Sequence, residues 1–272
     1  MTLARLVVMS GLVLSGTASV AAPLEWTLAL QAWTLNKKTF AETVATCAEL
    51  GLKAVEGFPG QVIGDGSDQK LVYTMDAASR AKVRDILQRH GVRWVNYGVV
   101  TVRGAAEWRK LFEFAKEMGI ETLVSEPAEN DLETISQLCD EFKIRIAIHN
   151  HPEPSHYWNP DTVLKAVQNR SPLMGACADT GHWLRSGLEP LDCIQKLRGR
   201  IISLHLKDLP QKGVKSVRDV PWGTGVGNLG QVLKELHQQG FKGVISIEYE
   251  NWGPDQMESI RKCIQWFQAW SP

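Results

Sequence analysis

The segment Ile146-Ala147-Ile148-His149-Asn150-His151 decides how this chain is expected to fold. An uninterrupted apolar run ends there, and two imidazoles follow at the point where it stops. A strand in a parallel sheet is buried on both faces and therefore reads as a continuous apolar run. We interpret residues 145–148 as such a strand, with functional side chains at its C-terminal end.

The same arrangement occurs in four further segments, each an apolar run that ends in carboxylates or imidazoles. They are Leu123-Val124-Ser125-Glu126, Ala176-Cys177-Ala178-Asp179-Thr180-Gly181-His182, Ile202-Ser203-Leu204-His205 and Val244-Ile245-Ser246-Ile247-Glu248-Tyr249-Glu250. In a closed parallel barrel these strand ends converge on one rim, where barrel enzymes carry their catalytic groups. The pattern indicates an enzyme site before any single motif is considered.

Strand-like and helix-like segments alternate after residue 22 without a long linker. We expect strands at residues 26–33, 54–58, 92–98, 122–125, 145–148, 174–178, 201–206 and 244–249. Helices are expected at residues 39–50, 76–90, 105–118, 131–142, 161–167, 190–197, 229–239 and 256–270. Parallel neighbours need crossovers, which helices supply. The pattern predicts an α/β protein, a single-domain (β/α)8 TIM barrel over residues 23–272, with a doubly wound open sheet as the rival.

Residues 1–22 have the features of a signal peptide. A short basic start precedes a mostly apolar stretch from Leu6 to Leu14, and small residues follow up to Ala21. A stretch of this length is too short to span a bilayer. We expect export to a bacterial periplasm or the exterior, with a mature protein that starts near Ala22 and has no membrane span. An N-terminal core helix is the alternative.

The charge balance restricts the class of partner. Lys plus Arg and Asp plus Glu each total 30 in 272 residues, so the formal net charge is zero. Binding to nucleic acid or an anionic membrane is favoured by a positive field that this composition does not provide. We therefore expect a small, roughly neutral molecule as the partner and no nucleic acid. Pairing of exposed barrel faces into a homo-oligomer is left open.

Four of the polar strand ends together make a metal-ligand set. The four residues are Glu126, Asp179, His205 and Glu248. Taken singly, each has a structural explanation, such as a salt bridge to a loop. Together, three carboxylates and one imidazole suit Mn²⁺, Mg²⁺, Co²⁺ or Zn²⁺. The set lacks thiolates and leaves coordination positions open, which is typical of a catalytic site. We expect one divalent metal ion there.

At these positions the chain resembles the xylose isomerase-like TIM barrel superfamily, also described as the sugar phosphate isomerase/epimerase family. The matching segments, in family order, are Glu126-Pro127, His149-Asn150-His151, Asp179-Thr180-Gly181-His182, His205-Leu206-Lys207-Asp208 and Ile247-Glu248. The resemblance covers essentially the whole chain after the leader. It implies that Glu126, Asp179, His205 and Glu248 bind one cation, that the two glutamates are the acid/base pair, and that His182 contacts substrate.

The expected chemistry is removal of a proton from a carbon next to a carbonyl, which leaves an enediolate. A cation that bridges the substrate oxygens stabilises that negative charge as a Lewis acid. One carboxylate takes the proton, and a second group returns it or protonates a leaving group. Glu126 and Glu248 are our candidates for these transfers. Glu250, two residues along the same strand, is the alternative to Glu248 because both point the same way.

Several further residues are expected to contact substrate. His149, His151 and His182 are candidate hydrogen-bond donors, with His151 alternatively a metal ligand. Glu56 and Lys207 lie near strand ends and are candidates for contact with sugar hydroxyls. Trp33 is one of several tryptophans near the rim whose flat rings can stack on a sugar. The segment Gly223-Thr224-Gly225-Val226-Gly227 has the wrong spacing for a dinucleotide loop; it is expected to approach substrate closely or to bind a phosphate.

Four functions remain open at this point. The first is a metal-dependent sugar isomerase or epimerase, and the second is a lyase that uses the same site to expel the aglycone of a 3-keto-glycoside. Export favours free or oxidised glycosides over sugar phosphates, which are chiefly cytoplasmic. A nuclease similar to endonuclease IV is the third, although residues 58 and 98 supply no further histidines for a metal cluster. The fourth is a non-catalytic sugar or metal binder.

Overall fold

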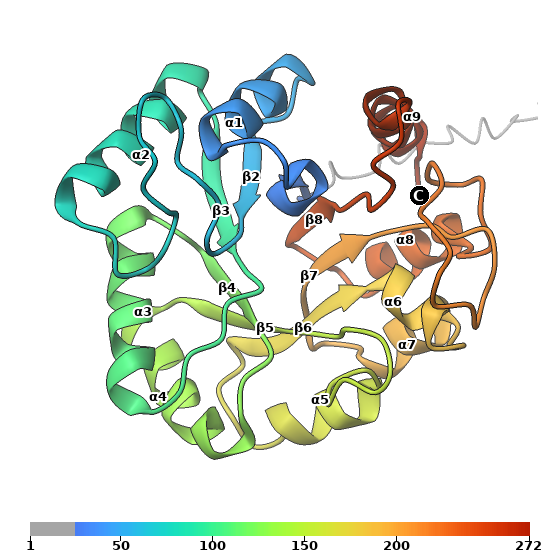
Figure 1. The fold of residues 1–272 in the computed structure, drawn as a ribbon. Helices are drawn as coiled ribbons and strands as arrows, with labels where there is room; N and C mark the ends of the chain where they lie inside the picture. The colour runs from blue at the N-terminus through green and yellow to red at the C-terminus, as the bar shows by residue number, and fades with distance from the viewer. Residues whose placement is uncertain (1–24) are drawn as a thin grey trace, which may run out of the picture.

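The computed structural model describes residues 25–272, in which eight parallel strands close into a barrel (Figure 1). The strands are β1 (Thr27–Gln31), β2 (Ala54–Gly57), β3 (Arg93–Tyr97), β4 (Thr122–Ser125), β5 (Arg145–His149), β6 (Met174–Asp179), β7 (Ile201–Leu206) and β8 (Val244–Ile247). β1 pairs in parallel with β8, from Thr27↔Val244 to Leu30↔Ile247. This pairing closes the sheet, so the predicted single-domain (β/α)8 barrel is confirmed and the open sheet is excluded. The expected signal peptide lies outside the described residues.

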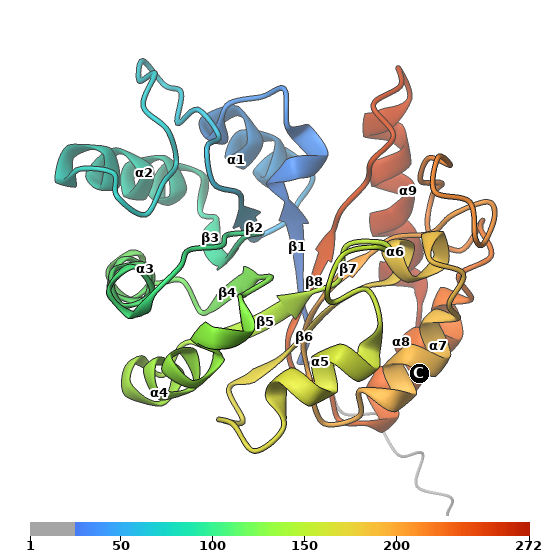
Figure 2. The ribbon, with the colours of Figure 1, turned by 60° about the horizontal axis from the view of Figure 1, so that its bottom comes forward.

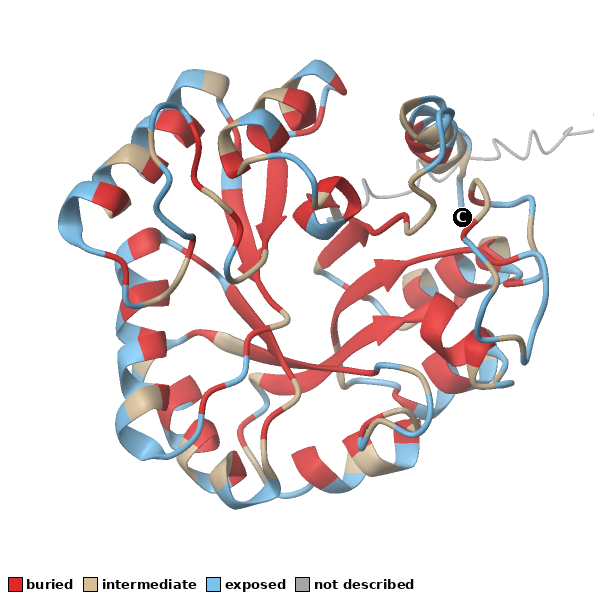
Figure 3. Cartoon of the chain, viewed as in Figure 1, coloured by how far each residue is buried: buried red, intermediate tan, exposed pale blue. Residues whose placement is uncertain are grey.

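Helices surround the barrel (Figures 1 and 2). They are α1 (Phe40–Glu49), α2 (Ala77–His90), α3 (Ala105–Met118), α4 (Leu132–Phe142), α5 (Pro160–Val167), α6 (Thr180–Arg185), α7 (Pro190–Lys196), α8 (Leu229–Gln238) and α9 (Gln256–Ala269), with 3-10 turns η1 (Ala32–Leu35) and η2 (Glu129–Asp131). Figure 3 shows the strands buried and the helices alternating between buried and exposed residues. None of the helices in this described part of the chain is long and apolar enough to cross a membrane.

Local signals explain where the helices begin and end. Thr39 and Glu42 form a reciprocal capping box at the start of α1, which satisfies backbone N–H groups that have no partner inside the helix. Gly91 and Gly119 end α2 and α3 in the left-handed conformation, at φ 59° and 71°, where glycine carries no Cβ penalty. After these glycines the chain leaves the helix and continues into the next strand, β3 or β4.

Two elements differ from the sequence-based expectation, and both shape the rim. The first strand ends at Gln31, and the next four residues turn into η1 instead of continuing to Trp33. A short helix, α6, begins directly after β6 because the Asp179 carboxylate accepts a hydrogen bond from the backbone N–H of His182 at 2.7 Å. Asp is among the preferred N-cap residues because its oxygen satisfies such a donor.

Small apolar residues fill the barrel below the rim. Ala147 and Cys177 pack together in one buried cluster, and Ala29 and Val244 belong to another. Side chains two apart on a strand point the same way, so Ala147 lies beneath His149 and Cys177 beneath Asp179. All five cysteines are buried and have free thiols. The packed interior leaves the C-terminal ends of the strands as the place for a site.

Candidate metal centre and active-site cavity

A cavity of about 350 Å³ lies at the C-terminal ends of the strands. Its polar lining comprises Gln31, His149, His151, His182, Glu248 and Glu250. Its apolar lining comprises Trp33, Phe58, Pro59 and Val99, which follow β1, β2 and β3. Strands four apart in a closed barrel of eight lie across from one another, so the aromatic residues after β1 and β2 face the histidines of β5 and α6.

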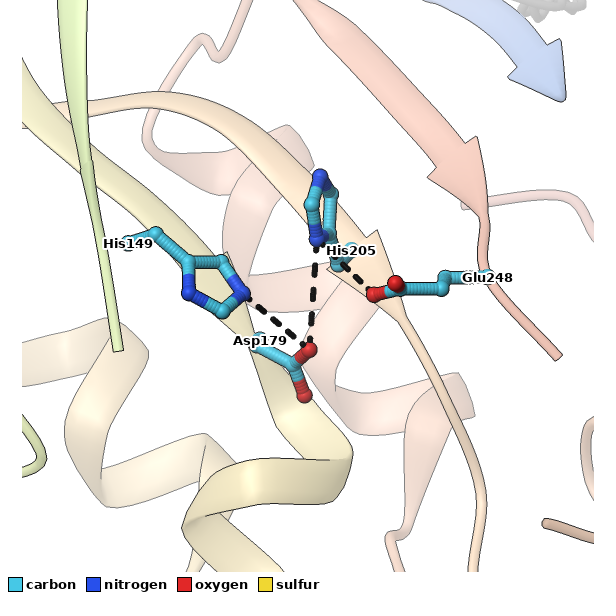
Figure 4. Close-up of side chains that lie close together, drawn as sticks. All are labelled: His149, Asp179, His205 and Glu248. Atoms are coloured by element: carbon cyan, nitrogen blue, oxygen red, sulfur yellow. Dashed lines mark ion pairs between the residues drawn. The ribbon is translucent and has the colours of Figure 1, made fainter. Parts of the chain in front are cut away.

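Four side chains from adjacent strands converge at the polar wall (Figure 4). They are His149, Asp179, His205 and Glu248, whose ligand-type atoms all lie within 4.8 Å of one another. Asp179 Oδ2 lies 3.5 Å from His149 Nε2 and 4.0 Å from His205 Nδ1. Glu248 Oε2 lies 2.9 Å from His205 Nδ1. We call these four residues the metal cluster.

The bonding of the metal cluster fits a divalent cation. The four atoms that face one another are His149 Nε2, Asp179 Oδ2, His205 Nδ1 and Glu248 Oε2; all are buried and none has a hydrogen-bond partner, although Lys207 Nζ forms ion pairs with the two carboxylate oxygens. Buried polar atoms are nearly always hydrogen-bonded, so four such atoms at a single point need an explanation. Two imidazole nitrogens and two carboxylate oxygens are a donor set for a divalent transition metal or zinc. The cluster therefore has both the chemistry and the unsatisfied atoms that such a cation requires.

Glu56 lies beneath the metal cluster and orients His205. Its Oε1 lies 2.7 Å from His205 Nε2, and its Oε2 accepts hydrogen bonds from Asn96 Nδ2 at 3.2 Å and Ser246 Oγ at 2.6 Å. When Nε2 of the neutral ring donates to Glu56, Nδ1 presents its lone pair to the cluster, the arrangement seen for metal-bound histidines. Glu56 is fully buried and absent from the cavity lining, in contrast to the sugar contact expected from the sequence.

Glu126 lies one strand further from the metal cluster than the sequence analysis expected. It follows β4, whereas the cluster residues come from β5, β6, β7 and β8, and His149 lies between Glu126 and Asp179. Glu126 Oε1 lies 3.1 Å from His149 Nδ1 and also contacts His151 Nδ1, while Oε2 accepts from Ser155 Oγ at 2.8 Å. The structure therefore brings three of the four expected ligands together and places His149 beside them as the fourth.

The hydrogen bonds of Glu126 define a second group of residues, which we call the Glu126 array: Glu126, His149, His151 and Ser155. Burial raises the pKa of Glu126, but hydrogen bonds from His149 and His151 outweigh it and hold the pKa well below its usual value. Both of its oxygens already accept hydrogen bonds. His151 is half exposed and lines the cavity. The array is thus a hydrogen-bonded carboxylate–imidazole system at the cavity wall.

Lys207 supplies a buried positive charge behind the metal cluster. Its Nζ lies 3.0 Å from Asp179 Oδ2, and 2.9 Å from an oxygen of each of Glu248 and Glu250. Lys207, expected from the sequence to contact substrate, is 1% exposed and does not line the cavity. Burial raises the pKa of Glu248, but Lys207 and His205 outweigh it and hold the pKa well below its usual value. Glu248 is therefore ionised at neutral pH.

Glu250 is separated from the metal cluster by its cationic partners. Arg185 Nη1 lies 3.1 Å from Glu250 Oε2, and Arg185 Nη2 lies 2.7 Å from Asp219 Oδ1. Of the two carboxylates that follow β8, only Glu248 belongs to the metal cluster. Arg185 Nη1 is also 3.0 Å from His182 Nδ1. This contact directs His182 Nε2 away from Arg185, toward Asp179 and the cavity.

The glycine-rich segment after β7 encloses a carboxylate of the protein itself. Asp208 Oδ2 accepts from the N–H groups of Gly223 and Gly225 at 2.9 and 3.0 Å, and Oδ1 accepts from Gly227 at 2.9 Å. A Cβ at Gly225 would lie 2.4 Å from Asp208 Oδ1. Glycine is needed here because the backbone approaches the carboxylate closely. The amides that a phosphate would use are therefore already occupied.

Sequence reasoning missed several residues that support the site. Gln31 accepts from the N–H of Trp33 at 2.5 Å and donates to the carbonyl of Gly98 at 3.2 Å, which ties the aromatic wall to β3. Gln31 could have been found, because it is a polar residue at the end of an apolar strand. Asn96, a polar residue near the end of another strand, was a weaker indication of the same kind. Asp219 and Arg185 lie outside strand ends, so nothing in the sequence marked them.

Comparison with known proteins places these features in a family. The family model described as "Xylose isomerase-like TIM barrel" matches residues 44–270. A solved structure of an uncharacterized protein from Parabacteroides distasonis is 36% identical, with a TM-score of 0.74, over 91% of this chain and 100% of that one. A xylose isomerase-like TIM barrel protein from Mycobacterium smegmatis, solved in complex with magnesium, has a TM-score of 0.70 at 14% identity, over 90% of this chain and 97% of that one.

Among curated proteins, an inosose dehydratase from Bacillus cereus is 29% identical over 135 residues. The match covers 44% of this chain and 45% of that protein, so the chain spans less than half of this relative's length. The family model, by contrast, covers nearly all of the barrel. The chain belongs to the xylose isomerase-like TIM barrel family.

Proposed function

We propose that this protein is a divalent-metal-dependent enzyme that removes a proton next to the carbonyl of a sugar and then eliminates a leaving group. The observation that carries this proposal is that the metal cluster and the Glu126 array lie side by side at one cavity. The metal cluster has four buried ligand-type atoms that face one another and have no hydrogen-bond partner. In the Glu126 array beside it, both oxygens of the Glu126 carboxylate are hydrogen-bonded, and His151 lines the cavity. The first suits a cation, and the second suits proton transfer.

His149, Asp179, His205 and Glu248 would hold the cation. Bound there, it would supply Lewis-acid stabilisation of negative charge on the substrate oxygens. Two imidazoles in the set favour zinc, cobalt or manganese over magnesium. Lys207 and Glu56 keep the carboxylate of Glu248 and the ring of His205 in position.

Proton transfer falls to Glu248 and His151. Glu248 directs Oε2 to the metal cluster, which leaves Oε1 to accept the proton from carbon. His151, as the imidazolium whose Nδ1–H donates to Glu126, delivers its Nε2 proton to the departing oxygen and is left neutral. The C–H bond and the C–O bond break, a C=C bond forms beside the carbonyl, and the leaving group departs as a neutral alcohol or water. General acid and base groups within reach of both atoms are what this step needs.

Elimination fits the structure better than the isomerase or epimerase expected first. Epimerisation by a glutamate pair needs one carboxylate on each face of the sugar, and the family resemblance implied that both would be ligands. Here Glu248 is the only glutamate of the metal cluster, and Glu126 contacts His149 and His151 instead. One carboxylate and one separate imidazole suit removal of a proton at one atom and its delivery at another. The partial likeness to an inosose dehydratase supports the same class.

Incubation with a 3-keto-glucoside in D₂O, with and without a chelator, tests the proposal. Release of the aglycone with loss of the neighbouring C–H supports elimination. Deuterium incorporation into an intact, epimerised or isomerised glycoside would instead support the isomerase. We further propose export through the leader, which sequencing of the mature N-terminus in the native host tests.

A further inference from the structure

The cavity presents no cationic side chain to a ligand. Its charged lining residues are the carboxylates Glu248 and Glu250, and its other polar lining residues are three imidazoles and Gln31. The nearby cations, Lys207 and Arg185, are buried and turned onto carboxylates of the protein. Apart from the proposed cation, which the carbonyl and hydroxyl oxygens of the sugar would meet, a phosphate or carboxylate on the substrate would face only like charge and neutral groups here.

The backbone offers an anion no alternative site in the glycine-rich segment. The N–H groups of Gly223, Gly225 and Gly227 all donate to the Asp208 carboxylate. An incoming phosphate would have to displace that carboxylate, which is 1% exposed at the residue level. Both observations point to an uncharged substrate.

The opposite wall is apolar and rigid. Trp33 is 40% exposed, one of two large apolar side chains in the described part of the chain that are this accessible. Its ring meets Phe58 edge to face, with ring centroids 5.1 Å apart. Gln31 fixes the Trp33 backbone and ties it to β3. The cavity thus keeps a preformed aromatic face open to solvent.

The two walls place different demands on a ligand. The sugar's carbonyl and hydroxyls must meet the metal cluster and the imidazoles, because these groups do the chemistry. Phe58, Pro59 and Val99 offer no side-chain hydrogen-bond partner, so a second polar ring there would lose hydrogen bonds to water. A flat apolar group would instead bury its surface and stack on Trp33.

We infer that the substrate is a neutral glycoside with an aromatic aglycone, held with its sugar on the polar wall and its aryl group against Trp33 and Phe58. This inference rests on the proposed function for the orientation of the sugar. The aryl group is the leaving group of the elimination, so the wall binds the part of the substrate that departs.

Binding of unreactive probes to the zinc-loaded protein tests the inference by isothermal titration. Phenyl β-D-glucopyranoside should bind about tenfold more tightly than methyl β-D-glucopyranoside. Glucose 6-phosphate should bind no better than glucose. Trp33→Ala should remove the preference for phenyl over methyl glucoside, and Trp33→Phe should keep most of it. Trp158→Ala, at a half-buried tryptophan outside the cavity lining, is the matched control.

Tighter binding of glucose 6-phosphate than of glucose would overturn the inference. So would a phenyl preference that survives Trp33→Ala in a variant whose circular dichroism matches the parent, or the absence of any phenyl preference. Proton exchange on a 3-keto-glucoside is measured separately and reports on the proposed reaction. If no proton exchange occurs while the preference for phenyl glucoside is intact, the proposed reaction is contradicted and the aryl-binding role of Trp33 and Phe58 is still supported.

Discussion

Nε2 of His205 lies 2.7 Å from Oε1 of Glu56, and both side chains are completely buried. The two residues come from β7 and β2, strands that are not neighbours in the barrel. The contact therefore crosses the barrel interior beneath the metal cluster. It makes Glu56 a positioning residue that acts through His205.

Replacing Glu56 by Leu should weaken zinc or manganese binding about 10- to 100-fold, the usual effect of losing the partner of a metal-bound histidine. The ring of His205 would lose the acceptor that orients it. Glu56→Gln should weaken binding less, because its amide oxygen can still accept from Nε2. Competition titration with a chromophoric chelator measures both affinities. Wild-type affinity in a folded Glu56→Leu protein would remove this role.

The number of metal ions bound per chain shows whether the metal cluster alone, or also the Glu126 array, binds metal. The protein should bind one divalent ion per chain, because the four facing atoms of the metal cluster lack hydrogen bonds, whereas both oxygens of Glu126 already have them. Asp179→Asn should abolish stoichiometric binding, whereas Glu126→Gln should keep one equivalent at reduced affinity, since Glu126 orients His149. Inductively coupled plasma mass spectrometry after dialysis measures the ratio. Two equivalents in the parent and one in Glu126→Gln would show that the Glu126 array is itself a metal site.

The sequence predicted the barrel and most of the cluster because both depend on where apolar runs end. Asp179, His205 and Glu248 lie at or just beyond strand ends, and the strands that carry them adjoin one another. Glu126 looked equivalent, but it belongs to β4, one strand beyond the group that meets at the cation position. Which strand ends meet depends on the closure and stagger of the barrel. The hydrophobic pattern of one strand does not contain that information.

The role of Glu56 was also predicted wrongly because one strand's pattern does not give its position in the closed barrel. Its position near the end of β2 marked it as an inward-facing rim residue, but the sequence does not give the depth of each strand end along the barrel axis. In the structure Glu56 meets Asn96 and Ser246 below the cavity. The prediction that the glycine-rich segment binds a phosphate has a related explanation. Its amides do bind an anion, but that anion is Asp208 of the same chain.

Lys207→Met should destabilise the metal-free protein by about 3 kcal/mol or more, the scale for removing one partner of a buried ion pair. Asp179, Glu248 and Glu250 would lose the cation that they share. Bound metal should restore part of the loss, because it supplies positive charge to two of these carboxylates. Urea denaturation with and without zinc measures both effects. Lys212→Met, at an exposed salt bridge to Glu189, is the control and should cost about 1 kcal/mol or less.

Asp219 should make stability fall as pH rises through the weakly acidic range. Burial raises its pKa from 3.8 to about 6, outweighing Lys207 and Arg185. Between these values the folded protein holds a proton that the unfolded chain has released, so the folded state is favoured at the lower pH. Relative to Asp219→Asn, the parent should lose about 3 kcal/mol between pH 4 and pH 7. Urea denaturation of both proteins at several pH values measures this difference. A difference that does not change with pH would contradict the raised pKa.

Gly225→Ala should destabilise the protein by about 1–3 kcal/mol, the usual cost of overpacking. The added Cβ would lie 2.3 Å from the carbonyl oxygen of Leu209 and 2.4 Å from Asp208 Oδ1. The segment must move, and the buried carboxylate then loses hydrogen bonds from the backbone. Gly230→Ala is the matched control: it lies in α8 with no atom within 4 Å of an added Cβ, so it should stabilise the protein by up to about 1 kcal/mol. Thermal denaturation of both variants measures the difference in stability. Equal midpoints would mean that the glycine-rich segment tolerates a side chain at Gly225. They would also mean that hydrogen bonding to Asp208 does not hold this segment in place.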